Sequence, residues 1–123
     1  MANPEFIAQV AIVKWLRIAM PTAIIQHCVN EVNMRGRAGM LKASRQKSAG
    51  VFSGFPDLIV LPAAGTGAFF LEVKSKVGRT SKSQDEAHGM LRHLGYPVAV
   101  VKTVDDVRAF LDAESIPHNE VMF

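Results

Sequence analysis

Apolar residues recur along the chain with two different spacings, and this change divides it into successive elements. Between residues 4 and 20 they follow the spacing of a helix, with Asn3 as N-cap, Pro4 in the first turn and Pro21 at the end. Shorter apolar runs bounded by turn residues indicate strands. The predicted order is helix, strand, helix, strand, strand, helix, strand, helix, over residues 4–20, 22–29, 37–48, 57–61, 69–74, 82–94, 97–102 and 105–113. This order predicts an α/β fold with a mixed central sheet flanked by helices.

The length of 123 residues suits one domain with its own core. We expect that domain over residues 1–114 and a C-terminal tail over residues 115–123. No apolar stretch is long enough to span a membrane, and the N-terminus lacks the basic-then-apolar pattern of a secretory signal. Cys28 is the single cysteine, so no internal disulfide framework exists. These features favour a cytoplasmic protein without a membrane partner.

Charged residues interrupt the two neighbouring apolar strands in the middle of the chain. Asp57 follows Pro56 at the start of one strand, and Glu72 and Lys74 stand two positions apart at the end of the next. Since alternate residues of a strand share a face, a hairpin would bring Asp57 to the face of Glu72 and Lys74. Carboxylates suit Mg²⁺ or Mn²⁺, and a nearby lysine can orient or deprotonate an attacking water. The alternative, a turn aspartate and a solvated surface pair, is disfavoured because charges near a core are costly unless paired or metal-bound.

Basic residues gather on both sides of these two strands. The net charge is only +3, so the distribution of the charges matters more than their total. A polyanionic substrate would require such clusters beside a metal site, although a solvated helix face and a mobile loop would look the same. The predicted nucleic-acid contacts are Arg35, Arg37, Lys42, Arg45, Lys47, Lys76, Arg79 and Lys82.

Other chemistries find less support in the sequence. The spacings of His27, Cys28, His88 and His93 match no standard zinc site. Cys28 has no adjacent catalytic partners, and no glycine-rich loop followed by Lys-Ser or Lys-Thr is present to hold a nucleotide.

Four blocks of the chain together carry a family resemblance that extends from about Glu5 to Phe110. They are Glu5 and Gln9 one turn apart in the first helix; Asn30 after the first strand; Leu41-Lys42-Ala43 leading to Gly54-Phe55-Pro56-Asp57-Leu58; and Leu71-Glu72-Val73-Lys74 with Ser81-Lys82-Ser83-Gln84 and Leu94-Gly95-Tyr96-Pro97-Val98. With these blocks the chain resembles the VRR-Nuc family, the virus-type replication-repair nucleases. The resemblance implies the restriction-endonuclease-like, PD-(D/E)xK fold.

The resemblance also implies roles for single residues. Asp57 and Glu72 would bind the catalytic ion, and Lys74 would be the catalytic lysine. Glu5 would reach the site as a further metal ligand, and Gln84 would complete it. The secondary positions are Gln9, Asn30, Glu31 and Ser81, with Glu31 standing where relatives often have glycine.

These roles describe a Mg²⁺- or Mn²⁺-dependent DNA endonuclease with little sequence specificity, because phosphate contacts position DNA without reading its bases. The resemblance further implies a phage-type homodimer acting on branched DNA such as Holliday junctions, in the host cytoplasm if the protein is viral. One alternative is a non-catalytic nucleic-acid-binding module on the same fold, which would need Asp57, Glu72 or Lys74 to be missing or misplaced. Another is a structural or regulatory phage protein that shares only the scaffold.

Overall fold

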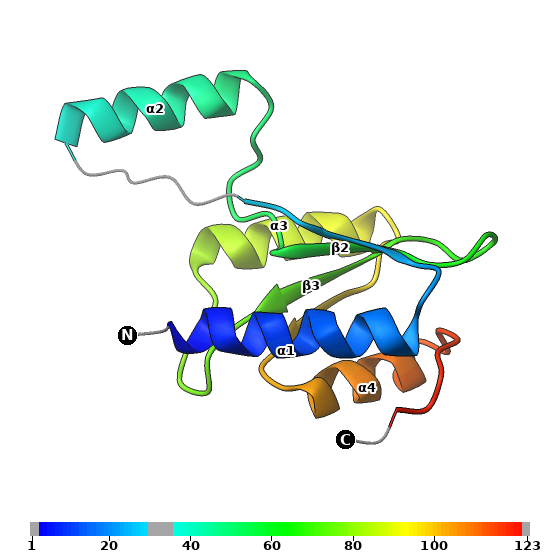
Figure 1. Ribbon diagram of the computed structural model, residues 1–123. Coiled ribbons are helices and arrows are strands. Elements are labelled where there is room, and N and C mark those ends of the chain that lie inside the picture. Colours follow the sequence, from blue (N-terminus) through cyan, green and yellow to red (C-terminus); the bar gives the residue numbers. More distant parts are fainter. Residues whose placement is uncertain (1–2, 30–35, 122–123) are drawn as a thin grey trace.

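Four strands form one mixed sheet in the computed structural model, which describes residues 3–29 and 36–121 (Figure 1). They lie in the order β1 (Ile24–His27), β2 (Leu58–Leu61), β3 (Phe69–Val73) and β4 (Val98–Val101). The pairs β1–β2 and β2–β3 are antiparallel, whereas β4 runs parallel to β3. A parallel pair requires a crossover connection, and a helix between β3 and β4 supplies it. The predicted mixed sheet with flanking helices is confirmed.

Four helices accompany the sheet in the described part of the chain: α1 (Pro4–Ala19), α2 (Gly36–Ser48), α3 (Lys82–His93) and α4 (Val104–Ala113). The side chain of Asn3 accepts a hydrogen bond from the backbone of Glu5, so the predicted N-cap of α1 is confirmed. Ser81 caps α3 and Thr103 caps α4, each within a capping box. Short polar side chains therefore fix where three of the helices begin.

Strand β1 is shorter than the predicted strand over residues 22–29. Its pairing with β2 runs from Ile24 opposite Leu61 to His27 opposite Leu58. A strand extends only as far as its neighbour can exchange backbone hydrogen bonds with it. The four-residue length of β2 therefore limits β1, although the apolar and β-branched run continues on both sides.

The two faces of the sheet carry different layers. Helices α1 and α4 lie on one face, where the main core forms (Figure 1). Its largest fully buried residues are Trp15, Phe69, Ile12, Leu16, Leu58, Leu71 and Leu111. Strand β3 is buried throughout, because α3 contacts its other face. Residues at odd positions of β3 enter the main core, whereas Glu72 points to α3.

The segment after α4 lies against the helices of the main core. Ile116 is buried in that core, and the backbone N–H of Asn119 donates to the carbonyl of Ala19 at 2.7 Å. The guanidinium of Arg108 donates to the carbonyl of Val121. The described part of the expected tail thus packs along α1 and α4.

Helix α2 stands away from the rest of the described structure (Figure 1). Its backbone comes close to no other helix or strand among the residues described, and its apolar Met40 and Leu41 are exposed. Tertiary packing does not hold α2 against the sheet. Within the described residues, no helix is long and apolar enough to cross a membrane.

Candidate active site

Asp57 and Glu72 meet at the point where strands β2 and β3 run side by side. Leu58 pairs with Leu71, so the preceding position brings Asp57 beside Glu72. One carboxylate oxygen of Asp57, Oδ2, accepts a hydrogen bond from the backbone N–H of Val73 at 2.8 Å. Glu72 is only 1% exposed. The hairpin thus brings together the two carboxylates that stand fifteen positions apart in the sequence.

The two carboxylates interact strongly in their partly dry surroundings. The pKa of Asp57 is raised to about 7, chiefly by burial and further by a hydrogen bond with Glu72 and the charge of Glu72. The hydrogen bond from the Val73 N–H and the charge of Lys74 act in the opposite direction and lower this pKa. Burial also raises the pKa of Glu72. Near neutral pH the Asp57 carboxyl is therefore partly protonated.

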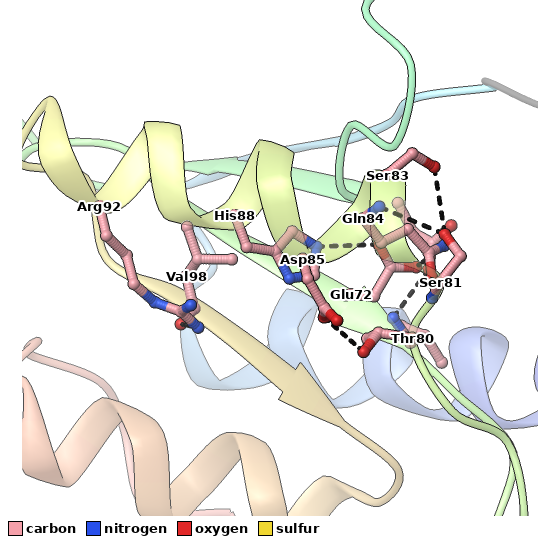
Figure 2. A network of polar contacts seen from close by, with 11 residues as sticks. Glu72, Thr80, Ser81, Ser83, Gln84, Asp85, His88, Arg92 and Val98 are labelled. Carbon is pink, nitrogen blue, oxygen red and sulfur yellow. Dashed lines mark hydrogen bonds and ion pairs between the residues drawn. The ribbon is translucent and has the colours of Figure 1, made fainter.

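Helix α3 holds the other side of the Glu72 carboxylate (Figure 2). The amide nitrogen of Gln84, Nε2, donates to Oε2 of Glu72 at 3.3 Å, and Nε2 of His88 lies 3.2 Å from Oε1. The amide oxygen of Gln84 accepts from the backbone N–H of Ser81 at 2.8 Å, as the second half of the capping box. Because the oxygen faces the helix cap, the NH₂ group must face Glu72. The helix cap and the site therefore share one side chain.

A cleft of about 660 Å³ opens beside this carboxylate pair. Six of the predicted site residues line it, whereas the buried Glu72 does not and lies behind Asp57 and Gln84, which do. The lining residues from that prediction are Glu5, Gln9, Asp57, Lys74, Ser81 and Gln84. Glu5 is close enough for its charge to raise the pKa of Glu72. The first turns of α1 and α3 thus face the same space as the ends of β2 and β3.

A glycine allows one wall of this cleft to form. Gly54 has a φ of +78°, and a Cβ atom there would lie 2.2 Å from the carbonyl oxygen of Ser83. Such a contact is sterically forbidden, so only glycine fits this close approach of the loop to the first turn of α3. The loop before β2 and the N-terminus of α3 are thereby held together at the edge of the cleft.

The remaining predicted contacts lie around the cleft or on α2. Asn30, Glu31 and Arg35 fall outside the described residues. Arg37 belongs to α2, and the exposed side chains are those of Lys42, Arg45 and Lys47 on α2 and of Lys76, Arg79 and Lys82 near the start of α3.

His88 is the site residue that the sequence did not predict. It entered only as a zinc candidate, yet it is 2% exposed and contacts Glu72. The available signal was its spacing: His88 stands four positions after Gln84, and residues four apart share a helix face.

The donor set at this site fits a hard divalent cation. Among the described residues, no group of three or more His, Cys, Asp or Glu side chains is arranged to hold a metal ion. Mg²⁺, however, needs only one or two carboxylates from a protein, because it keeps several waters and takes further oxygens from phosphate. A dication at Asp57 and Glu72 would favour the ionised form of Asp57, against the burial and the neighbouring Glu72 that raise its pKa.

Comparisons with known proteins identify the family of this chain. The profile of the VRR-NUC domain matches residues 4–105, which include both strands of the carboxylate pair and the helix that covers it. The chain belongs to the VRR-NUC family. The family resemblance inferred from the sequence is thus confirmed, and VRR-NUC is a nuclease-type family.

A solved structure described as a "VRR_NUC domain protein" has the same fold as this VRR-NUC chain. The two superimpose with a TM-score of 0.67 over 92% of this chain and 88% of the other, at 22% sequence identity. At that identity the likeness establishes the fold. A search of curated proteins found no match.

Proposed function

We propose that this VRR-NUC protein is a divalent-metal-dependent endonuclease that hydrolyses phosphodiester bonds of DNA. The observation that carries the proposal is the paired carboxylates of Asp57 and Glu72 at a cleft that Lys74 also lines. In this proposal Asp57 and Glu72 hold Mg²⁺ or Mn²⁺, with Glu5 nearby on the cleft wall. The ion would supply a Lewis acid and positive charge at the scissile phosphate.

The side chains around the pair have distinct roles in this proposal. In the reaction a water oxygen bonds to phosphorus, the bond from phosphorus to the leaving oxygen breaks, and that oxygen takes up a proton. Lys74 contributes an amine beside the carboxylates, where it can orient the water or stabilise the negative charge that develops on the phosphate. Gln84 keeps Glu72 in place through its amide, and Glu5 and Gln9 bring further polar groups from α1.

Exposed cations around the cleft support DNA as the substrate. Lys76, Arg79 and Lys82 lie between β3 and the first turn of α3, and α2 carries three more exposed cations on a projecting helix. Cations of this kind bind phosphates and position a duplex without reading its bases. We therefore propose weak sequence specificity and binding that falls steeply with salt.

Branched DNA and a homodimer belong to the proposal as well. Each chain offers one such cleft, and a four-way junction needs two symmetrically placed cuts for resolution. Two copies of the chain would supply two clefts and a longer basic surface. The proposed setting is the cytoplasm, which is the host cytoplasm if the protein is viral.

The decisive experiment is the cleavage of an end-labelled four-way junction beside a linear duplex of matched sequence, in Mg²⁺, Mn²⁺ or EDTA. The variants are Asp57→Asn and Lys74→Gln, with Lys14→Gln as a control because Lys14 is exposed on α1 and does not line the cleft. We expect metal-dependent cleavage by the wild type and the control, and a loss of at least 100-fold in both site variants, as for removal of one transition-state-stabilising group.

The outcomes separate the alternatives. Paired symmetrical cuts on the junction alone would support the junction and dimer parts of the proposal, whereas cutting of both substrates would remove them and keep the nuclease. Salt-sensitive binding without cleavage of any substrate would favour the non-catalytic module. Wild-type rates in Asp57→Asn or Lys74→Gln would show that the site is wrongly placed.

The contribution of α2 can be measured from the salt dependence of binding. Replacing Lys42, Arg45 and Lys47 together by alanine removes three exposed cations from this helix. If each contacts a phosphate, the slope of log K against log salt for duplex DNA becomes shallower by about 2.7. The control is Lys14→Ala with Arg17→Ala, which removes two exposed cations of α1 outside the cleft lining and should keep the wild-type slope. A wild-type slope in the α2 variant would exclude α2 as a DNA contact.

A further inference from the structure

Helix α3 presents two polar side chains to the same carboxylate on successive turns. Gln84 and His88 are four positions apart, so both lie on the helix face that covers β3 (Figure 2). Each takes a different oxygen of Glu72, with Gln84 at 3.3 Å from Oε2 and His88 at 3.2 Å from Oε1. Glu72 is 1% exposed and His88 is 2% exposed. Protein groups therefore have to satisfy this carboxylate where water has little access.

The chemistry of the contact decides which nitrogen of His88 carries the proton. Nε2 of His88 lies 3.2 Å from Oε1 of Glu72, and both side chains are almost fully buried. A neutral imidazole has one N–H, and an ionised carboxylate can only accept hydrogen bonds. The contact with Oε1 of Glu72 is a hydrogen bond only if Nε2 carries the proton. The tautomer of His88 is thereby fixed by its partner.

We propose that His88 is a positioning residue of the VRR-NUC site, which together with Gln84 fixes the orientation of the Glu72 carboxylate. The proposal rests on the proposed function, in which Glu72 is a metal ligand. A carboxylate has about four acceptor positions, and α3 occupies one on each oxygen. Asp57 lies beside Glu72 on the neighbouring strand, and in the proposed function the two carboxylates would share the cation. Such outer partners of metal ligands set the orientation of the ligand and its affinity for metal.

A purely structural role for His88 predicts a different outcome. If His88 served only to fill space and to satisfy a buried charge, its loss would lower the free energy of unfolding and leave the cation affinity of the folded protein unchanged. If His88 positions Glu72, its loss changes the cation affinity of molecules that are still folded. Stability and affinity therefore have to be measured on the same variants.

The first measurement is Mn²⁺ binding to the full chain, followed by the paramagnetic signal of the free ion, without DNA. His88→Leu removes the N–H, whereas His88→Gln keeps an N–H donor at a similar reach. Val98→Ala is the control, because Val98 is a buried apolar residue that pairs with Phe70 in the sheet and does not contact Glu72. We expect His88→Leu to weaken Mn²⁺ binding by about 10-fold or more, the usual effect of losing an outer partner. His88→Gln should stay within about 3-fold of the wild type, and Val98→Ala should bind normally although it is less stable.

The second measurement is the long-range ¹H–¹⁵N NMR spectrum of the imidazole in the metal-free wild type, which needs no variant to fold. We expect the Nε2–H tautomer for His88 and a changed Nε2 shift in Glu72→Gln. An Nδ1–H tautomer, or wild-type Mn²⁺ affinity in folded His88→Leu, would overturn the proposal. Weakened Mn²⁺ binding in a protein that cleaves no DNA would support the positioning role and contradict the nuclease, so the two proposals fail separately.

Discussion

The raised pKa of Asp57 makes the metal-free protein less stable at high pH than at low pH. Folding raises the pKa of Asp57 from its ordinary 3.8 to about 7, so between these values the folded chain holds a proton that the unfolded chain has lost. The free energy of unfolding therefore falls as the pH rises through this window, and the full loss is present above about pH 7. Asp57→Asn mimics the protonated form, because its amide keeps an oxygen for the Val73 N–H and gains a donor for Glu72.

The magnitude follows from the size of the shift. A rise of about three units at 1.36 kcal/mol per unit gives about 4 kcal/mol as an upper bound. Asp57 lines an open cleft and is only half-buried, and solvent screening reduces this to about 2 kcal/mol. By the same reasoning, the loss of unfolding free energy at pH 4.5 is only about 0.5 kcal/mol, because this pH lies just above the ordinary pKa of Asp57 and the loss accumulates as the pH rises from that value towards the raised one.

Urea unfolding in EDTA at pH 4.5 and pH 8 tests this reasoning. We expect Asp57→Asn to be more stable than the wild type by about 2 kcal/mol at pH 8 and nearly equal at pH 4.5. Glu86→Gln is the control, since Glu86 is an exposed carboxylate of α3, and it should show little difference at either pH. A variant that is less stable than the wild type at pH 8 would refute the idea that burial and the neighbouring Glu72 disfavour an ionised Asp57 in the folded state.

Two further predictions concern the elements that frame the site. Gly54→Ala should destabilise the protein by about 1–3 kcal/mol more than Gly65→Ala and slow any cleavage, because both glycines have positive φ but only Gly54 abuts Ser83. Equal losses of stability in the two variants, measured by urea unfolding, would show that the clash is not important. Thr103→Ala removes the cap of α4 and should cost about 1 kcal/mol in the same assay. Its cleavage rate per folded molecule should be unchanged, and a large loss of rate would contradict the assignment of α4 to the scaffold.

Local patterns in the sequence were enough to predict most of the elements. The starts of three helices can be predicted from their N-cap residues, because capping depends on residues within one turn. These N-caps are Asn3, Ser81 and Thr103. The pairing of the hairpin follows from two apolar runs with a short turn, and it places Asp57 beside Glu72. Each of these features depends on residues that are near one another in the chain.

Features that depend on distant residues were harder to predict. The ends of β1 are set by its partner strand, about thirty positions away, and not by its own composition. Whether a polar side chain of α3 reaches Glu72 depends on the crossover that lays α3 over β3. For that reason Gln84 was predicted as a site residue only through the family resemblance. His88 is not part of the sequence blocks that carry the resemblance, so its contact with Glu72 was not predicted.

The capping box of α3 has a consequence for the motions of the site. One amide, that of Gln84, bonds the Ser81 N–H with its oxygen and Glu72 with its nitrogen. Fraying of the first helical turn is therefore coupled to loss of the Gln84 contact with Glu72, while His88 still contacts the other oxygen. Hydrogen exchange at the Ser81 amide then reports how often the site comes apart, even without substrate. Helix ends usually exchange quickly, so slow exchange at this end would reveal how firmly the site holds the helix in place.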